Sequence, residues 1–194
     1  MTRKSVDLLL PTPPAWVEIV LSNFDAFLQD HANCERKASA LAMSFVVKYP
    51  DRRSITASLI DLAQEELEHF RAVYEIMEQR GLRLARDEPD LYVNRLLAVA
   101  RHGYEDRFLD RMLISSVVEC RGAERFGLIA DALDTGPMKS FYERLRKSET
   151  KHGHLFVQLL LKEFDAERVY PRLEELMEIE ADIIPGLELR PAMH

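Results

Sequence analysis

The chain has 194 residues, of which 47% are hydrophobic and 30% are charged, and its formal net charge is −7. This composition predicts a single globular domain, residues 1–194, and it argues against binding of nucleic acid through overall positive charge. Glycine (7 residues) and proline (9 residues) are scarce, which favours helices over a turn-rich β fold.

The sequence also bears on the compartment. Apolar runs stay far below the ~18 residues of a membrane span, so no membrane association is expected. The first 16 residues have a basic start but lack the apolar core of a signal peptide, which predicts a cytoplasmic protein. Two cysteines, Cys34 and Cys120, are too few for a disulfide framework and are expected to be packing residues.

Amphipathic patterns predict five helices along the chain. The first begins after Pro13-Pro14, and Ser54 is the expected N-cap of the second. Gly81 is a typical C-terminal residue for that second helix. The predicted helices span about 15–49, 54–81, 104–133, 137–164 and 170–183.

Residues 82–103 separate the second and third patterns, and 89–100 could form a short helix within them. Such a stretch is long enough to run from one end of a helical bundle to the other. A long crossover at this place is the connection of ferritin-like bundles. The predicted fold is therefore all-α: a ferritin-like four-helix bundle with a crossover between helices two and three and an extra C-terminal helix.

Two Glu-x-x-His motifs lie in the second and fourth patterns, at Glu66/His69 and at Glu149/His152. Residues three apart share a helix face, and in both patterns that face is otherwise apolar. An ionised carboxylate on a buried face is costly unless something compensates its charge, and a metal ion can do so. Each motif alone is weak evidence because Glu and His are common residues.

The first and third patterns each place one carboxylate on an apolar face, Glu35 and Glu119. Glu35 precedes Glu66 by 31 residues, and Glu119 precedes Glu149 by 30. One Glu from each of two helices, together with Glu-x-x-His from the other two, is the ligand set of di-metal carboxylate proteins. Four carboxylates would balance two divalent ions, and ligands of this kind suit iron or manganese.

Some neighbouring residues are alternatives. Glu124 could replace Glu119, but it breaks the spacing and leaves the apolar stripe. His31, one turn before Glu35, is either an extra ligand or, as we prefer, a supporting or core histidine. His102, His154 and His194 belong to no pattern. The expected metal ligands are thus Glu35, Glu66, His69, Glu119, Glu149 and His152.

Ligands of this type leave the reaction open, because they serve iron storage, peroxide disposal, radical generation and hydroxylation alike. A ferritin-like iron-oxidising or storage protein is therefore one alternative, and a helical scaffold without metal is another. A rubrerythrin is disfavoured because the chain has no CxxC pair.

The residues around the ligands resemble the MiaE family of tRNA hydroxylases over about residues 8–185. The similar segments are 8–13 (LLLPTP), 30–38 (DHANCERKA), 61–70 (DLAQEELEHF), 110–113 (DRML), 118–126 (VECRGAERF) and 148–152 (SETKH).

The resemblance implies an O₂-dependent di-iron monooxygenase that hydroxylates the isopentenyl chain of 2-methylthio-N6-isopentenyladenosine beside the tRNA anticodon. The family's ligands match the six expected residues one by one. The resemblance also implies a partner that donates electrons, such as a ferredoxin or a reductase.

A tRNA substrate requires a local basic patch on this acidic chain, because phosphate contacts dominate nucleic-acid affinity. Three clusters are available: Lys48, Arg52 and Arg53; Arg80, Arg83 and Arg86; Arg144, Arg146 and Lys147. The hypothesis is that one of them docks the anticodon arm. The sequence does not choose among them.

Overall fold

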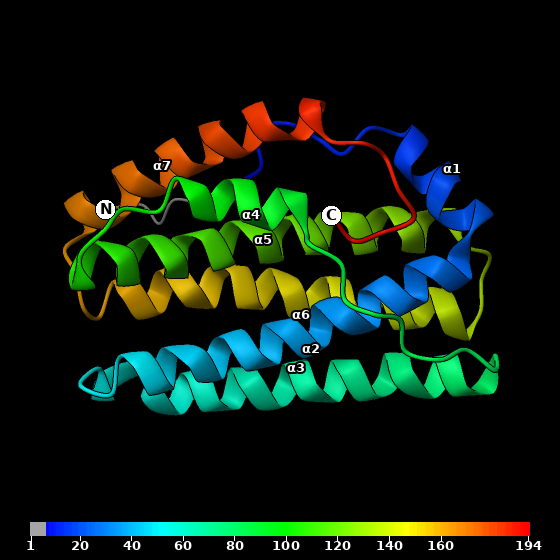
Figure 1. Cartoon of the computed structure of the whole chain (residues 1–194), viewed down its shortest axis with the longest axis horizontal. Helices are drawn as coiled ribbons and strands as arrows, with labels where there is room; N and C mark the ends of the chain where they lie inside the picture. The colour runs from blue at the N-terminus through cyan, green and yellow to red at the C-terminus, as the bar shows by residue number, and fades with distance from the viewer. Residues whose placement is uncertain (1–6) are drawn as a thin grey trace. The chain divides into compact units, whose positions relative to one another are not determined.

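A computed structural model describes residues 7–194, and every element of regular structure in this part of the chain is helical. Figure 1 labels the helices in chain order. The elements are α1 (Ala15–Ser22), α2 (Phe24–Lys48), α3 (Arg53–Gln79), α4 (Leu91–Ala98), α5 (Tyr104–Ala132), α6 (Pro137–Leu160), α7 (Ala166–Ile183) and the 3₁₀ turn η1 (Ile184–Gly186).

The predicted helices differ from these in a few places. The single helix predicted for 15–49 is two helices, because Asn23 ends α1 and caps α2, where its side chain accepts a hydrogen bond from the Ala26 amide. Ser54 is not the N-cap of α3, since Arg52 occupies that position. The helix predicted for 137–164 ends at Leu160, and the last helix begins four residues earlier than expected.

Other predictions are confirmed. Gly81 follows α3 with a φ of 71°, a left-handed conformation that glycine adopts at little cost. The short helix expected in the crossover is α4, whose N-terminus is capped by the Asp90 side chain at 3.0 Å from the Val93 amide. The long connection between the second and third predicted helices is therefore present.

The described part of the chain forms two compact units, one made of residues 7–17, 90–188 and 194, the other of residues 18–89 and 189–193. We call them the α5–α6 unit and the α2–α3 unit. The prediction of a single domain stays a prediction.

The α2–α3 unit is a hairpin of two long helices that lie side by side (Figure 1). On α3, for example, Ile55, Leu59 and Leu62 are buried and lie four and three residues apart, which is the spacing of an amphipathic helix. Ser39 reinforces the pairing, because its hydroxyl donates to the Ala63 carbonyl at 2.7 Å.

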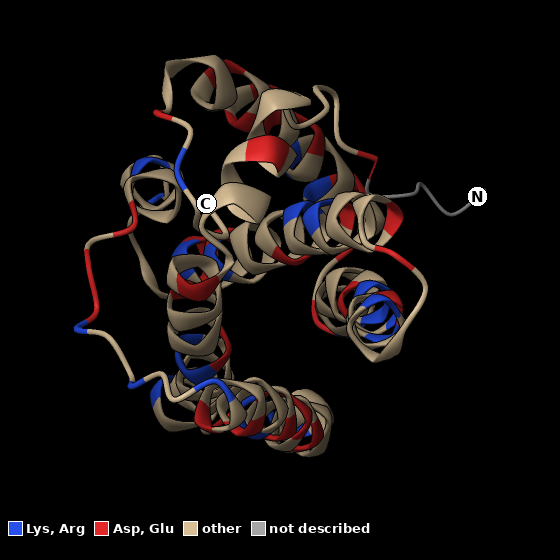
Figure 2. Ribbon diagram, turned by 90° about the vertical axis from the view of Figure 1, so that its right-hand side faces the viewer, with Lys and Arg blue, Asp and Glu red and all other residues tan. Residues whose placement is uncertain are grey.

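The first part of the crossover is fastened to α2. Gln29 and Asn33 donate to the carbonyls of Arg83 and Ala85 at 2.8 and 3.3 Å, and Lys37 pairs with Asp87 at 2.9 Å. The three α2 residues are four apart and so lie on one face. Figure 2 shows this segment as an extended loop that carries both basic and acidic residues.

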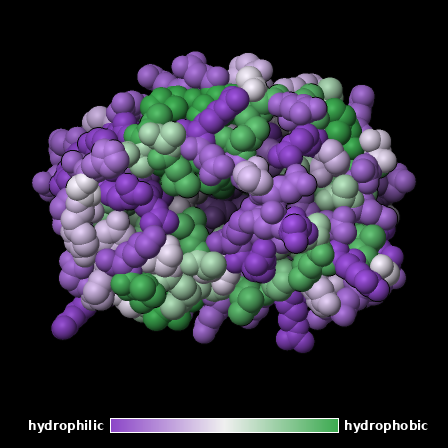
Figure 3. Space-filling model, in the orientation of Figure 1, coloured by the Kyte–Doolittle hydropathy of each residue, from purple (hydrophilic) through white to green (hydrophobic). Residues whose placement is uncertain are grey.

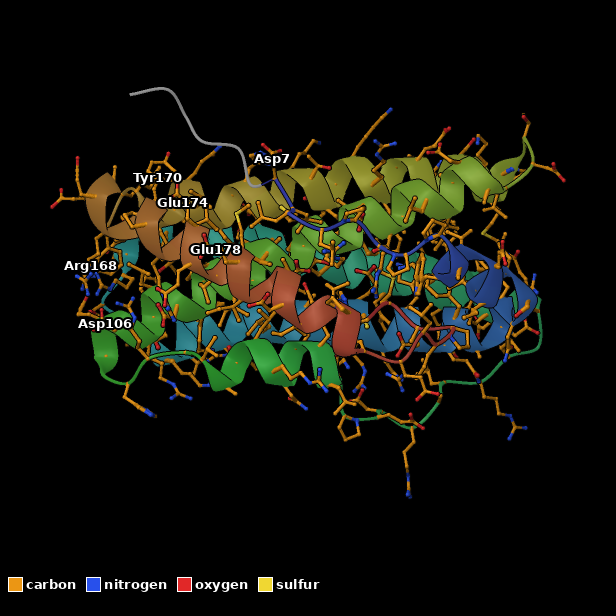
Figure 4. All side chains as sticks on the ribbon, turned by 90° about the horizontal axis from the view of Figure 1, so that it is seen from above. Asp7, Asp106, Arg168, Tyr170, Glu174 and Glu178 are labelled. Atoms are coloured by element: carbon orange, nitrogen blue, oxygen red, sulfur yellow. The ribbon has the colours of Figure 1, made fainter. Side chains whose placement is uncertain are left out.

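In the α5–α6 unit, α5 contacts α6, α7 and α4. It is the most buried helix, with Phe108, Met112, Leu113, Val117 and Ile129 all fully enclosed. Arg168 of α7 and Asp106 of α5 form an ion pair at 2.8 Å, and both are labelled in Figure 4.

Asp110 joins three segments of this unit. Its carboxylate is fully buried and accepts hydrogen bonds from Arg101 at the end of the crossover (2.7 Å) and from Arg172 on α7 (2.8 Å). Burial alone would raise the pKa of Asp110, but the hydrogen bonds from Arg101 and Arg172 outweigh it and lower that pKa.

This lowered pKa predicts an acid-dependent loss of stability. The Asp110 contribution is fully present above the ordinary value of 3.8 and is lost as the pH falls through the lower pKa of the folded state. We expect the difference in free energy of unfolding between the wild type and Asp110→Asn to shrink between pH 5 and about pH 2. Urea unfolding at several pH values measures it. A difference that stays constant over this range would contradict the assignment.

The surface contains exposed apolar as well as polar residues. Figure 3 shows hydrophobic and hydrophilic residues interspersed on one face, and the large apolar side chains with the highest exposure are Val47, Leu9, Leu91 and Leu67. Among residues 7–194, none of the helices has the length and hydropathy needed to cross a membrane.

Candidate metal centre

The α2–α3 unit brings together the three ligands expected from its sequence. His69 Nδ1 of α3 lies 3.4 Å from a Glu66 oxygen on the same helix and 3.5 Å from a Glu35 oxygen on α2. Each residue offers one ligand atom within 4.8 Å of the others. Glu35 and Glu66 are buried and His69 is half-buried, so the unit holds two carboxylates and an imidazole away from bulk water.

The α5–α6 unit contains the second set. His152 Nδ1 lies 3.2 Å from a Glu149 oxygen on α6, and Glu119 projects from α5. The three residues again offer ligand atoms within 4.8 Å of one another. Glu149 and His152 are buried, and Glu119 is half-buried. The two units therefore present the same chemistry, namely two carboxylates and one imidazole from two antiparallel helices.

Gly153 sets the close approach of α5 and α6 beside this second set. Ser116 on α5 donates its hydroxyl to the Gly153 carbonyl at 2.6 Å. A Cβ at position 153 would lie 2.5 Å from the Cys120 sulfur and 3.2 Å from the Ser116 carbonyl oxygen. Only glycine leaves room for this helix contact, which lies next to both His152 and Glu119.

Gly153→Ala should therefore lower the free energy of unfolding by about 1–3 kcal/mol through overpacking. The double variant Gly153→Ala/Cys120→Ala should recover part of the loss, because it removes the sulfur that the new methyl group meets. Chemical unfolding of the wild type, both single variants and the double variant measures the coupling. Additive losses would show that the Cys120 contact does not limit position 153.

The structure gives separate roles to the alternative residues. Glu124 accepts hydrogen bonds from the Thr12 amide and hydroxyl at 2.8 and 2.7 Å and pairs with Arg121, so it takes part in a structural network. His31 is fully buried, and its Nε2 lies 2.7 Å from Glu35 Oε1. The sequence left the role of His31 open, although its spacing of four from Glu35 was the available signal.

The remaining histidines and cysteines lie in other surroundings. His154 Nδ1 contacts the Thr150 carbonyl, and the His194 ring stacks on Tyr92. Both cysteines are free thiols. Burial raises the pKa of the Cys120 thiol to about 12, so this residue is a neutral packing group at neutral pH.

The donor set fits iron. Carboxylate oxygens with a minority of imidazole nitrogens are the ligands of non-haem iron and manganese sites, whereas thiolates would point to zinc or an iron–sulfur cluster. Buried carboxylates also need a compensating positive charge, which a divalent cation supplies.

Comparison with known proteins narrows the range of reactions that the chain could catalyse. Residues 1–194 match the family described as tRNA-(MS2IO6A)-hydroxylase (MiaE). A Pseudomonas putida protein named tRNA 2-(methylsulfanyl)-N(6)-isopentenyladenosine(37) hydroxylase is 31% identical over 182 residues, which cover 93% of this chain and 88% of that protein. The chain belongs to the MiaE family. Its resemblance to this family, seen in the segments around the ligands, is thereby confirmed.

A further MiaE relative carries the same name. It comes from Salmonella typhimurium and is 26% identical over 231 residues, covering 93% of this chain and 85% of the relative. Membership of this family makes the chain an enzyme of the tRNA hydroxylase type, an oxidoreductase that acts in tRNA modification.

The fold also has a solved counterpart. A structure described as protein 43 with aldehyde deformylating oxygenase activity from Synechococcus matches with a TM-score of 0.90 and 33% identity, covering 96% of this chain and 94% of that one. The MiaE chain has the predicted all-α, ferritin-like fold, and its buried carboxylate–histidine sets fit a di-iron site.

Proposed function

We propose that this MiaE chain is a di-iron monooxygenase that hydroxylates the isopentenyl group of 2-methylthio-N6-isopentenyladenosine in tRNA. The observation that carries the proposal is the pair of matched carboxylate–histidine sets, one in each helical hairpin, in a member of a tRNA hydroxylase family. Residues 1–194 would then act as one domain.

The six residues Glu35, Glu66, His69, Glu119, Glu149 and His152 would hold the two irons. Three ligands from either hairpin leave a metal incompletely bound, whereas six protein ligands with four carboxylate charges suit two ferrous ions. When bound, the two ferrous ions supply the activation of O₂. The word oxygenase in the description of the Synechococcus relative supports O₂ as co-substrate.

The proposed hydroxylation needs electrons and protons as well as O₂. Conversion of a C–H bond to C–OH with O₂ also produces water and consumes two electrons and two protons. An external donor such as a ferredoxin or reductase would supply these electrons. Because tRNA is a cytoplasmic substrate, we expect the enzyme to act in the cytoplasm.

The chain's own residues would prepare the site. The contact of His31 with Glu35 orients that carboxylate. Met112 and Phe126 on α5 and Leu145 and Phe156 on α6 are buried apolar side chains, and they would exclude water and receive the apolar isopentenyl group.

The decisive experiment combines metal analysis with turnover. The protein is loaded with Fe(II) without oxygen, its iron is counted, and it is then given O₂, a reductant and tRNA that carries the prenylated base. We expect about two irons per chain and a hydroxylated nucleoside in the tRNA digest. Absence of this product from iron-loaded protein would refute the proposal.

The same samples test the alternatives. A ferritin-like storage protein would form a multi-subunit cage and oxidise many irons per chain, and a metal-free scaffold would bind none. An aldehyde, taken from the description of the Synechococcus relative, serves as a second substrate. Turnover of the aldehyde without tRNA hydroxylation would assign a different oxygenase activity.

A further inference from the structure

Helix α6 has a buried face and an exposed face. Glu149 and His152 lie on the buried face, whereas Arg144, Lys147 and Lys151 are exposed. Each residue turns a helix by about 100°, so the three cations fall within ~60° of one another. The same geometry places Glu149 about 140–160° and His152 about 80–140° around the helix from these cations. One helix therefore carries proposed iron ligands on its buried face and a basic stripe on its exposed face.

The basic stripe is positively charged, unlike the chain as a whole. Helix α6 has five Lys or Arg and two Glu, although the whole chain has a net charge of −7. Helix α7, which packs on α5 in the same unit, has six acidic and two basic residues. Its exposed acidic side chains include Glu174 and Glu178, which are labelled in Figure 4. A polyanion would be attracted to α6 and repelled by α7.

The stripe's cations are available for a ligand. Among residues 7–194, the structure shows no ion pair for Arg144, Lys147 or Lys151. The Arg144 guanidinium lies 5.9 Å from the centre of the Phe141 ring, which holds that side chain along the helix.

In each of the other two basic clusters, one cation is paired or largely buried. Arg80 is taken by Asp25 at 2.6 Å, and the Arg52 side chain is only 12% exposed. Arg146, the remaining member of the α6 cluster, lies across the helix pair, with its guanidinium close to Gly127 on α5. Of the clusters seen in the sequence, the α6 surface thus retains the most cations without acidic partners, once Lys151 is added to it.

We propose that Arg144, Lys147 and Lys151 bind the phosphates of the tRNA strand that carries the base to be hydroxylated. This inference rests on the proposed function. At ~1.5 Å of rise per residue, the three cations follow one another at steps of ~4.5 and ~6 Å along the axis, a spacing that suits successive phosphates of one strand.

The position of the stripe fits a base that leaves its stack. Enzymes that modify a nucleobase extrude it from the stack into a pocket while the backbone stays outside. The stripe and the ligand face are separated by no more than one helix diameter, ~10 Å. A strand held on the outside of α6 thus keeps its phosphates in water while one extruded nucleotide reaches around the helix to the proposed irons.

The test replaces the three cations with glutamine, which keeps helix propensity and a polar side chain (Arg144→Gln, Lys147→Gln, Lys151→Gln). The matched control makes the same change at three exposed cations on other segments (Arg71→Gln, Arg107→Gln, Lys162→Gln). Both triple variants change the net charge from −7 to −10, because each removes three positive charges.

Binding of prenylated tRNA to the iron-loaded protein is measured from 50 to 200 mM salt, and hydroxylation is measured at varied tRNA concentration. For the stripe variant we expect at least a tenfold weaker affinity at low salt and a slope of log K against log salt that is smaller by about 2. Its KM for tRNA should rise in proportion while kcat stays near the wild-type value, and the control should resemble the wild type.

Equal losses in the two variants would mean that only net charge matters, and no loss in the stripe variant would place the phosphates elsewhere. Either result overturns the inference. If the wild type binds tRNA but does not hydroxylate it, the proposed reaction fails while the binding comparison still tests the stripe. If the wild type binds no tRNA, the inference falls together with the proposed substrate.

Discussion

Replacing Glu66 with alanine should remove iron from the protein and lower hydroxylation at least 100-fold. Glu66 is 1% exposed, and its carboxylate lies beside the His69 imidazole in the α2–α3 unit. Loss of residues that merely support a metal ligand already costs 10- to 100-fold in affinity or activity, so loss of a ligand should cost at least as much. Iron analysis after gel filtration and nucleoside analysis of tRNA measure the two effects.

Stability gives a second readout that does not depend on turnover. A ligand that binds only the folded state stabilises it, by ~2.7 kcal/mol at a concentration of 100 Kd. Fe(II) should therefore raise the unfolding temperature of the wild type but not that of Glu66→Ala. Without metal the variant should be no less stable than the wild type, because the buried carboxylates repel one another and one of them has been removed.

Glu68→Ala is the matched control for this experiment. Glu68 lies two residues from Glu66 on the same helix but is exposed. It should keep the iron, the activity and the thermal shift of the wild type. If Glu66→Ala also keeps two irons per chain, or if Glu68→Ala loses them equally, the ligand assignment is wrong.

The sequence was most informative where one helix decides the outcome. Helical periodicity alone places Glu66 with His69, and Glu149 with His152, on one face, and the structure shows both pairs within 3.4 Å. The long stretch of sequence between α3 and α5 likewise predicted the crossover, and α4 lies within that stretch. In these cases the prediction depends only on a spacing of three or four residues within one helix, or on the number of residues in one connecting segment.

The sequence was least informative where distant residues meet. Asp110 and Arg172 are 62 residues apart, and Arg121 and Glu180 are 59 apart, so no local pattern announces either buried pair. Asn23 was missed for a different reason. The apolar periodicity continues across it, and the helix is interrupted by the non-helical backbone of Asn23, whose side chain caps α2.

The Arg121–Glu180 pair is also the contact whose loss should cost the most stability. Both side chains are fully buried, and the Arg121 guanidinium donates to both Glu180 oxygens, at 2.8 and 3.0 Å. Tyr92 donates to the same carboxylate at 3.1 Å. Burial, followed by the negative charge of Glu180, raises the pKa of Tyr92, so its hydroxyl remains protonated and able to donate.

Arg121 extends this network to the N-terminal segment, donating to the Leu10 carbonyl at 2.8 Å and to the Thr12 hydroxyl at 3.2 Å. It also pairs with Glu124 on its own helix. The Arg121 guanidinium therefore ties α5 to α7 and to residues 10–12, and Glu180 extends the network to α4 through Tyr92. Its removal should affect the whole α5–α6 unit.

Glu180→Ala should lower the free energy of unfolding by about 3–5 kcal/mol, because it leaves a buried guanidinium without its bidentate partner. For a chain of this length that corresponds to a fall in Tm of ~10 °C. Glu178→Ala, at an exposed position on the same helix, should change stability by less than ~0.5 kcal/mol.

The double variant Glu180→Leu/Arg121→Met should lose less stability than Glu180→Ala, since replacing both charges leaves neither one buried alone. Calorimetry of the four proteins separates these cases, and a Glu180→Ala variant as stable as Glu178→Ala would show that the pair does not hold α7 to α5.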